Sequence, residues 1–353
     1  MRIASVVYAN FYTFNQSRIY TVALARIRYS INIKMINKLL RCLPLLFVLS
    51  ACIDDDISRN DNCLANLPAT DTDQWIKLEP MNVGRFDAAF EMSCSKIFVL
   101  GGSSNAPRSG EYYDLKTNKW HKTTDLIEEQ TGVTSELINN KIYLFGNQMS
   151  SKVQYYDIVS DSWSYTTDFP VESLYWATSE SYNGQIYIMG GYIPSEVDNP
   201  KKMYIFDTST ETYEEDTIPS DLERPRSIRV DDIFYLWSAG IMYTYNPINE
   251  TWKKIESASD YMKFNQMGLF YKDKILFIGG SEEPGKDSPA TTDITVFDPL
   301  EDNWSIISSS INYGRHYRFG VFSKDTSLFI VGGREAITWE SIKDLEYISN
   351  LEL

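Results

Sequence analysis

The sequence predicts an all-β protein, a six-bladed β-propeller of four-stranded antiparallel blades, on three observations. An aromatic residue follows an Asp or Asn by six positions five times along the chain. The five intervals are Asp114 to Trp120, Asp157 to Trp163, Asp207 to Tyr213, Asn246 to Trp252 and Asp298 to Trp304. A short apolar run, ending in Gly-Gly or a variant, precedes each interval. The period is roughly forty to fifty residues, which is that of a propeller blade.

Each repeat carries the pattern of four short strands. The apolar runs are rich in β-branched and aromatic residues and close on glycine, which is typical of buried strands rather than helices. There are six runs, at residues 96–100, 141–145, 185–189, 232–237, 274–278 and 327–331. A tight polar turn joins each run to a strand before it, a third strand ends near the Asp, and a fourth carries the aromatic residue.

The two ends of the repeat region each supply part of one blade. Residues 346–349 fit a third strand, but the sequence stops at Leu353, before any fourth strand. Conversely, residues 73–78, which include Trp75, form a fourth strand without a blade of its own. We expect the two segments to pair, because closing the ring removes the free strand edges of an open array.

The repeat resembles the kelch repeat, in which a di-glycine ends the second strand and a Tyr-Asp with a Trp six residues later marks the third and fourth. The resemblance covers Trp75 to the C-terminus and implies one six-bladed propeller, residues 73–353, whose last blade is closed by an N-terminal strand. Blade four departs most from the pattern. Ser238-Ala239-Gly240 stands there in place of the di-glycine, and Asn246 in place of the Asp.

The segment before the propeller has the features of an export signal. Residues 35–51 combine a basic start, a short apolar core and small residues before Cys52, which is typical of a secretory signal peptide. The ending Leu49-Ser-Ala-Cys52 resembles a bacterial lipobox, so we expect Cys52 to be the lipidated first residue of the mature chain. Ordinary secretion with Cys52 left free is the alternative. A lipid anchor holds a protein firmly on a membrane.

Two further segments complete the predicted organisation. Residues 1–34 precede Met35, the expected true start, and are interpreted as an upstream extension called in error. Residues 52–72 are polar and acidic without apolar periodicity, which predicts a flexible tether. These features predict a lipid-anchored protein of the bacterial outer membrane, periplasmic or surface-facing, that contacts membrane through its anchor only.

The charge of the exported part limits its partners. All 48 acidic residues follow Ala51, together with 26 of the 33 basic ones, so this part carries a formal charge of −22. Such a field repels nucleic acid. We therefore expect that the protein does not bind nucleic acid. As a separate expectation, it is a monomer with a protein or glycan ligand at the channel mouth.

Two cysteines of the exported part are candidates for a disulfide. Oxidising compartments favour such bonds. Cys94 falls at the turn between the first two strands of blade one, on the face where the segment containing Cys63 leads into the ring. A bond between Cys63 and Cys94 is one expectation, and two unpaired thiols are the other.

Candidate ligand-binding residues lie where first strands begin, at the mouth of the central channel, where propellers place binding sites. They are mainly arginines with aromatics between them, a set that suits a carboxylate or a sugar acid. The candidates are Arg85, Tyr175, Trp176, Arg224, Arg226, Arg315, His316 and Arg318. Pairing of these arginines with neighbouring acids at blade junctions is the structural alternative.

A second set of polar residues falls within the first strands. Glu91, Glu136 and Glu180 stand ten residues before the first glycine of their pairs, and Arg229 has the equivalent place in blade four. We expect an inward acidic arc closed by one cation, with pKa values perturbed by burial. Its role is either structural, linking neighbouring blades, or catalytic or ion-binding.

The sequence favours a binding module over an enzyme. With only His121 and His316, it does not offer the histidines of a copper oxidase, and we expect no metal and no cofactor. The competing function is a periplasmic carbohydrate isomerase similar to the sialic acid mutarotase (N-acetylneuraminate epimerase) family, which needs no metal. Its acid-base chemistry would fall to the candidates Glu136, Glu180, Arg226 and Arg315.

Overall fold

A computed structural model describes residues 67, 74–147, 150–195, 201–283, 288–307, 311–335, 338 and 340–353. The predicted extension, signal peptide and nearly all of the predicted tether lie outside the described residues. Within the described part, no helix has the length and apolar character to cross a bilayer. The propeller belongs to the compact unit of residues 55–353.

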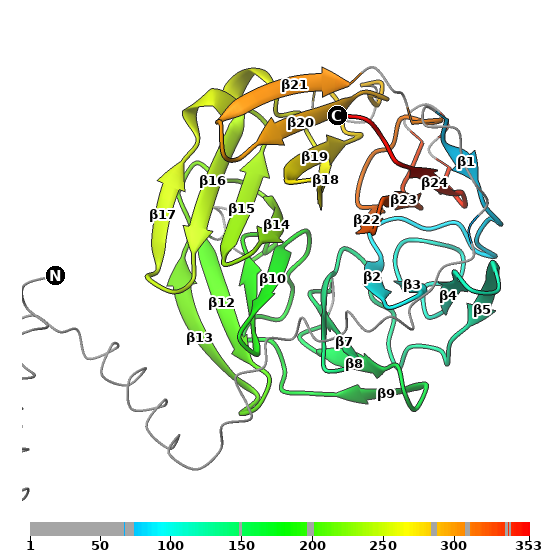
Figure 1. Cartoon of the computed structure of the whole chain (residues 1–353). Coiled ribbons are helices and arrows are strands. Elements are labelled where there is room, and N and C mark those ends of the chain that lie inside the picture. The colour runs from blue at the N-terminus through cyan, green and yellow to red at the C-terminus, as the bar shows by residue number, and fades with distance from the viewer. Residues whose placement is uncertain are drawn as a thin grey trace, which may run out of the picture. The chain divides into compact units, whose positions relative to one another are not determined.

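Six four-stranded antiparallel sheets surround a central channel (Figure 1). Blades one to three comprise β2 (Ala89–Ser93), β3 (Lys96–Leu100), β4 (Gly110–Asp114), β5 (Lys119–Lys122); β6 (Thr134–Ile138), β7 (Lys141–Phe145), β8 (Gln154–Asp157), β9 (Ser162–Tyr165); β10 (Thr178–Tyr182), β11 (Gln185–Met189), β12 (Lys202–Asp207) and β13 (Thr212–Thr217). In each blade the first strand is innermost and the fourth outermost.

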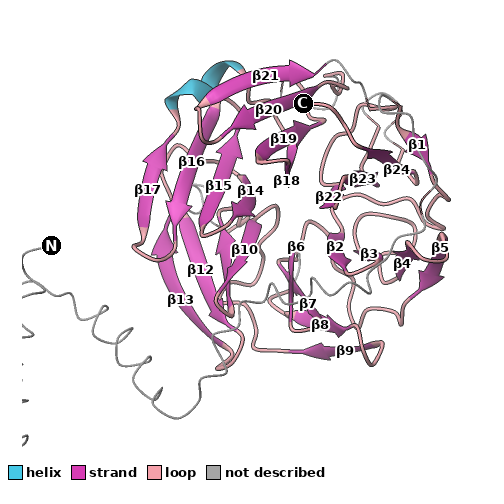
Figure 2. Cartoon of the chain, viewed as in Figure 1, coloured by secondary structure: helices cyan, strands magenta, loops and turns pink. Residues whose placement is uncertain are grey.

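The remaining blades repeat this order. They comprise β14 (Arg226–Val230), β15 (Ile233–Ser238), β16 (Ile241–Asn246), β17 (Thr251–Lys254); β18 (Met267–Tyr271), β19 (Lys274–Ile278), β20 (Ile294–Asp298), β21 (Asn303–Ile307); β22 (Gly320–Lys324), β23 (Ser327–Val331), β24 (Leu345–Ser349) and β1 (Ile76–Lys77). A short 3-10 helix, Glu256–Asp260, follows β17 and is the helix drawn in Figure 2.

The predicted closure is confirmed. Strand β1 is the fourth strand of blade six and pairs with β24, with Ile76 opposite Tyr347. The side chain of Trp75 is 7% exposed and packs among apolar residues of blades five and six, including Ile348. The two ends of the repeat region therefore share one sheet.

Each half of the Asp-to-Trp interval makes a defined local contact. The Asp ends the third strand, and its carboxylate accepts backbone N–H bonds from the turn that follows, as Asp157 does from Val159 and Ser160 at 2.9 Å. This is the Asx turn. The indole of Trp163 donates to the carbonyl of Thr124, in the connection that leaves blade one, at 2.9 Å. The repeat thus fixes both the hairpin and the contact between neighbouring blades.

The second glycine of the pair is required by close packing. Gly102 has φ +86°, and a Cβ there would lie 2.6 Å from the Cβ of Ala88. Apolar burial is divided into six clusters, each shared by two neighbouring blades, such as Val99 with Phe329 between blades one and six. Because each blade is buried against both neighbours, the fold depends on the closed ring.

Candidate functional site

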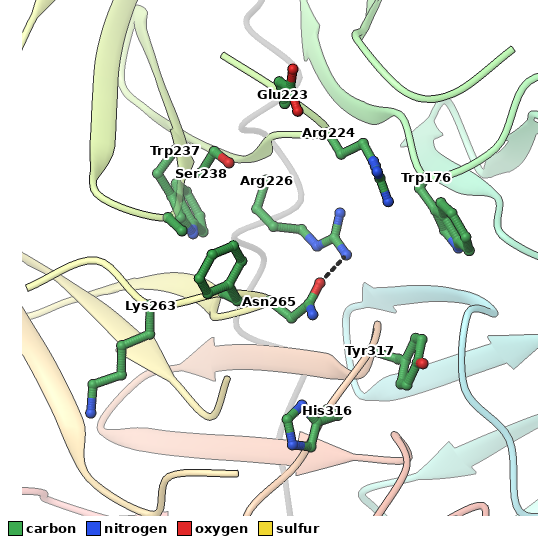
Figure 3. A pocket seen from close by; sticks show the side chains of 12 residues that line it. Trp176, Glu223, Arg224, Arg226, Trp237, Ser238, Lys263, Asn265, His316 and Tyr317 are labelled. Atoms are coloured by element: carbon green, nitrogen blue, oxygen red, sulfur yellow. Dashed lines mark hydrogen bonds between the residues drawn. The ribbon is translucent and has the colours of Figure 1, made fainter. Parts of the chain in front are cut away.

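The segments entering the first strands line a cavity of about 340 Å³ at the mouth of the channel (Figure 3). Its walls come from blades three to six, and aromatic and basic side chains predominate. The lining residues are Trp176, Glu223, Arg224, Arg226, Trp237, Ser238, Ala239, Lys263, Phe264, Asn265, His316 and Tyr317. Four predicted ligand-binding residues are among them, namely Trp176, Arg224, Arg226 and His316.

Each blade has a residue of left-handed backbone conformation two or three positions before its first strand. The six are Asp87, Gly132, Trp176, Arg224, Asn265 and Tyr317, with φ between 42° and 69°. Bulky residues such as Trp176 and Tyr317 rarely adopt this conformation, and strained backbone of this kind clusters at functional sites. Four of the six line the cavity.

Arg226 lies at the centre of the cavity (Figure 3). Its side chain is 7% exposed and makes only long hydrogen bonds, 3.4 Å to the carbonyl of Pro225 and 3.3 Å to Oδ1 of Asn265, while its Nε has no partner among the described residues. Burial lowers the pKa of Arg226 to about 10, against the attraction of Asp87, so the guanidinium is charged at neutral pH. A charged donor is therefore held at the cavity with spare bonding capacity.

Arg318 and Asp87 support the floor of the mouth. Arg318 donates to the carbonyls of Val133, at 2.9 Å, and Ala177. Burial and then the charge of Arg226 hold the pKa of Arg318 well below its usual range. Asp87, 5% exposed, accepts bonds from the backbone N–H of Arg318 and from Nε1 of Trp176, both at 3.2 Å. One carboxylate thus faces two buried guanidinium groups.

Aromatic side chains extend the mouth around Arg224. Its guanidinium carbon lies 5.5 Å from the ring centre of Trp176 and 6.0 Å from that of Tyr192. Tyr175, a predicted ligand residue, packs edge-on against both rings, at 4.7 and 5.1 Å. Such cation-π contacts orient the guanidinium without neutralising it.

A similar stack occupies another part of the mouth. Arg334 lies over Phe86 and Tyr317, with its guanidinium carbon 4.8 and 5.7 Å from the ring centres. His316 directly precedes Tyr317 in the sequence. Its Nε2 is 2.9 Å from the carbonyl oxygen of Ser288. Burial lowers the pKa of His316, so its imidazole is neutral at pH 7.

Three predicted arginines do not line the mouth cavity: Arg318, described above, and the two arginines Arg85 and Arg315. Arg85 and Arg315 are 1% and 0% exposed, and each pairs with a glutamate of its own blade, Glu111 and Glu346. The same glutamates accept bonds from Asn82 at 2.8 Å and Asn312 at 2.7 Å. The sequence left open that these arginines pair with neighbouring acids at blade junctions instead of binding a ligand. Arg85 and Arg315 do form ion pairs, but each does so with an acid of its own blade.

The acidic residues of the first strands lie deeper in the channel. Ser135 donates to Glu91 at 2.7 Å across the junction of blades one and two. Burial and the charge of Glu136 raise the pKa of Glu91 to about 8. Burial raises the pKa of Glu136 to about 7, against bonds from Ser181 and Ser179, and burial with the charge of Glu136 raises that of Glu180 well above its usual value.

The predicted register is wrong by one residue in blade four. Glu91 pairs with Phe98, Glu136 with Tyr143 and Glu180 with Tyr187, whereas the residue opposite the equivalent Tyr235 is Ile228. Arg229 is the next residue along, and its Nη1 donates to the carbonyl of Ser181 at 2.6 Å. Its charge still acts on Glu136 and Glu180, lowering their pKa values.

The catalytic candidates do not form one site. Glu136 and Glu180 lie on first strands and bond to serines of the next blades, Arg226 is at the mouth, and Arg315 is buried against Glu346. Arg226 lines both the mouth cavity and a smaller cavity of about 160 Å³ in the channel below it.

Sequence reasoning missed Asp87, Asn265 and Tyr317 as residues of the mouth. Asp87 and Asn265 lie two residues before their first strands, as do Trp176 and Arg224, which the sequence did identify, and Tyr317 lies three residues before its own. Cys94 is disulfide-bonded, at a turn with φ 54°. Cys63 lies outside the described residues, so the pairing of these two cysteines stays a prediction.

The six blades around a loop-lined mouth define a β-propeller, and comparison with known proteins specifies its type. A family model described as "Kelch motif" matches residues 84–127. Kelch-like protein 15 of Danio rerio and of Homo sapiens is 24% identical over 277 residues, covering 73% of this chain and 40% of the relative. Kelch-like protein 25 of Xenopus tropicalis is 31% identical over 106 residues, covering 28% and 18%. The chain is a kelch-repeat β-propeller.

A solved structure supports the same fold. The structure titled "Structure of YjhT" aligns with a TM-score of 0.65 at 16% identity, covering 76% of this chain and 96% of that chain. At this identity the likeness concerns the fold alone. The chain matches 40% of the length of the Kelch-like protein 15 relatives, so their whole-protein activities do not transfer to it.

Proposed function

We propose that this propeller is a binding module of the bacterial cell envelope whose mouth binds a protein or glycan through an acidic group, with a glycan that ends in a sugar acid as the favoured ligand. Kelch propellers generally mediate protein binding. The observation that carries the proposal is Arg226, charged and 7% exposed at the cavity, with two long hydrogen bonds as its only ones to the described residues. A carboxylate supplies the short, charge-assisted bonds that this guanidinium lacks.

The cavity favours a sugar acid as the group bound. Its volume of about 340 Å³ is at the lower end for small-molecule sites, which suits one ring-sized unit. Trp176 and Tyr317 provide flat apolar surfaces, while Ser238 and Asn265 provide hydrogen-bonding groups for hydroxyls. The ligand would then place its carboxylate on Arg226 and its ring among the aromatics.

A glycan array read with the purified protein tests this proposal. We expect retention of glycans that end in glucuronate or N-acetylneuraminate and no retention of the same glycans with a neutral terminal sugar. Titration calorimetry with the free acids and with their methyl esters serves as the control, since the esters keep the ring and lose the charge. Equal binding of acids and esters would exclude a carboxylate site.

One observation favours the isomerase as a second candidate. Burial raises the pKa of Glu136 to about 7, a value suited to proton transfer at neutral pH. A mutarotation assay by NMR on sugar acids separates the two functions. An enzyme accelerates anomer exchange, and Glu136→Gln abolishes the acceleration while leaving the fold intact, whereas a binding module leaves the exchange rate unchanged.

The location of the protein is a separate part of the proposal. It depends on the lipobox-like sequence before Cys52, which lies outside the described residues. We expect metabolic labelling with a palmitate analogue to mark the protein in the outer-membrane fraction, and Cys52→Ser to abolish both the label and the membrane association. A labelled protein after this substitution would exclude Cys52 as the anchor.

A further inference from the structure

Blade four contributes a much shorter connection to the mouth than its neighbours do. Strand β15 ends at Ser238 and β16 begins at Ile241, so only Ala239 and Gly240 join them. In blade five the corresponding strands end at Ile278 and begin at Ile294. The wall around the mouth is therefore low over blade four.

The mouth cavity lies at this low part of the wall. Half of its lining residues belong to blade four, including Ser238 and Ala239 of the short connection itself. In Figure 3, Ser238 and Trp237 lie to one side of the central Arg226, and Trp176 and Tyr317 lie to the other. The site is thus bounded by Trp176 and Tyr317 on one side, and by Trp237 with the two-residue turn that follows it on the opposite side.

We infer that the mouth binds the end of a chain: the terminal sugar acid of an oligosaccharide occupies the cavity at Arg226, and the sugars linked to it leave the mouth over the Ser238–Ile241 turn of blade four. This inference rests on the proposed function and adds the direction of the bound chain. The inference specifies a terminal sugar acid. An internal sugar is linked to a neighbour at both ends, so the chain would have to leave the cavity at two places.

The groups beside the turn suit sugar hydroxyls. The carboxylate of Glu223 is 3.7 Å from Lys201, and its side chain is 61% exposed. Lys263, 12% exposed, is 2.9 Å from Glu282, whose side chain is 71% exposed. Together with the Ser238 hydroxyl, these groups present both donors and acceptors along the exit, as neutral sugars require.

The substitution Ala239→Trp tests the inference, since it raises a bulky side chain over the exit and leaves Arg226 unchanged. Two probe pairs are titrated, glucuronate with a glucuronate-terminated hyaluronan tetrasaccharide and N-acetylneuraminate with sialyllactose. Because Ala239 lines the cavity, we expect the affinity for the free acids to fall as well, and the affinity for the matching oligosaccharide to fall at least tenfold further. Leu300→Trp is the control, because Leu300 is 87% exposed in a turn between third and fourth strands, at the opposite end of its blade, and should change neither affinity.

The outcomes separate this inference from the proposed function. If the wild-type protein binds no free acid, both are overturned. If it binds the free acids and Ala239→Trp weakens acid and oligosaccharide equally, or neither, the exit over blade four is overturned and the proposed function stands. Should Ala239→Trp fail to fold, Ala239→Gln gives the same comparison with a smaller side chain.

Discussion

Two regions of this propeller bury arginine in opposite ways. Inside blade six, Arg315 is completely buried beside Glu346 and also donates to the carbonyl of Gly332. At the mouth, Arg226 is nearly as buried and has no ion-pair partner among the described residues, only two long bonds to neutral oxygens. The Nε of each arginine has no partner among the described residues, but the first has an ion pair within its own blade, whereas the second has none and keeps bonding capacity that a ligand can use.

Blade two has a neutral pair at the position of the blade-internal Arg–Glu pair. Gln130 and Gln154 occupy the places that Arg85 and Glu111 have in blade one, and they hydrogen-bond to each other at 2.9 Å. Gln130 also donates to the carbonyl of Lys152, much as Arg85 does to that of Ser109. A neutral pair of similar shape therefore does the same work, so the role of the blade-internal arginines is structural.

Removing the carboxylate of the blade-internal pair should have the largest effect. Glu346→Ala leaves the charge of Arg315 buried without a counter-ion, and we expect a loss of about 3–5 kcal/mol in the free energy of unfolding. Urea denaturation measures it. The matched control is the double variant Arg315→Gln with Glu346→Gln, which copies blade two and should lose much less. Equal losses would show that the charge is not the cause.

Removing the mouth arginine should affect binding rather than stability. Arg226→Met deletes the charged donor, and we expect affinity for sugar acids to fall at least thirtyfold, from about 2–4 kcal/mol of lost interaction. The urea midpoint should fall much less than in Glu346→Ala, because Asp87, the buried carboxylate that faces Arg226, keeps the charge of Arg318 and its bonds from the Arg318 backbone N–H and Trp176. A loss of stability like that of Glu346→Ala, with binding retained, would place Arg226 with the structural arginines.

The channel carboxylates predict the pH dependence of stability. The pKa values of Glu91 and Glu136 rise on folding from 4.5 to about 8 and about 7, so the folded state binds more protons than the unfolded state. Stability therefore falls as pH rises from about 5 to 8. We expect Glu136→Gln to reduce the total loss in the free energy of unfolding over this pH range by about 1–2 kcal/mol. Urea denaturation at several pH values measures it. An unchanged slope would contradict the coupling of these groups.

A smaller and opposed pair of effects is expected at Asp87. Asp87→Asn suits the left-handed backbone, φ 53°, but removes the carboxylate that faces Arg226 and Arg318. The extra positive charge should tighten binding of sugar acids about threefold, while the free energy of unfolding falls by about 1 kcal/mol. Weaker binding would mean that Asp87 holds the arginines in their binding positions.

The sequence predicted the fold in detail because its repeat encodes local contacts. The Asp-to-Trp interval identified five hairpins, and the unmatched strand at Trp75 predicted the closure with β24. The register failed only in blade four, where Ser238-Ala239-Gly240 replaces the di-glycine and counting back from it gives Arg229 instead of Ile228. Because only two residues connect β15 to β16, no di-glycine marks the position from which the residues of the first strand are counted. The correct register follows only from the pairing of β14 with β15.

The site was predictable in its position and less so in its members. Mouth residues were identified from where first strands begin, but periodicity does not separate Arg226, at the cavity, from Arg315, within a blade. The distinction depends on Glu346, a partner distant in sequence. Asn82 and Asn312, each three residues before its arginine, are the local signal that marks the blade-internal type.

The shared sheet of β1 and β24 also governs how the protein is made. Strand β1 can form its hydrogen bonds only after β24 (Leu345–Ser349) has been synthesised. The first strand of the propeller to be made is therefore among the last to pair. During translation the apolar face around Trp75 has no blade to cover it, and such surface is prone to aggregate. Completion of the ring is therefore a late event, and a nascent chain interrupted before residue 345 is a natural substrate for chaperones and proteases.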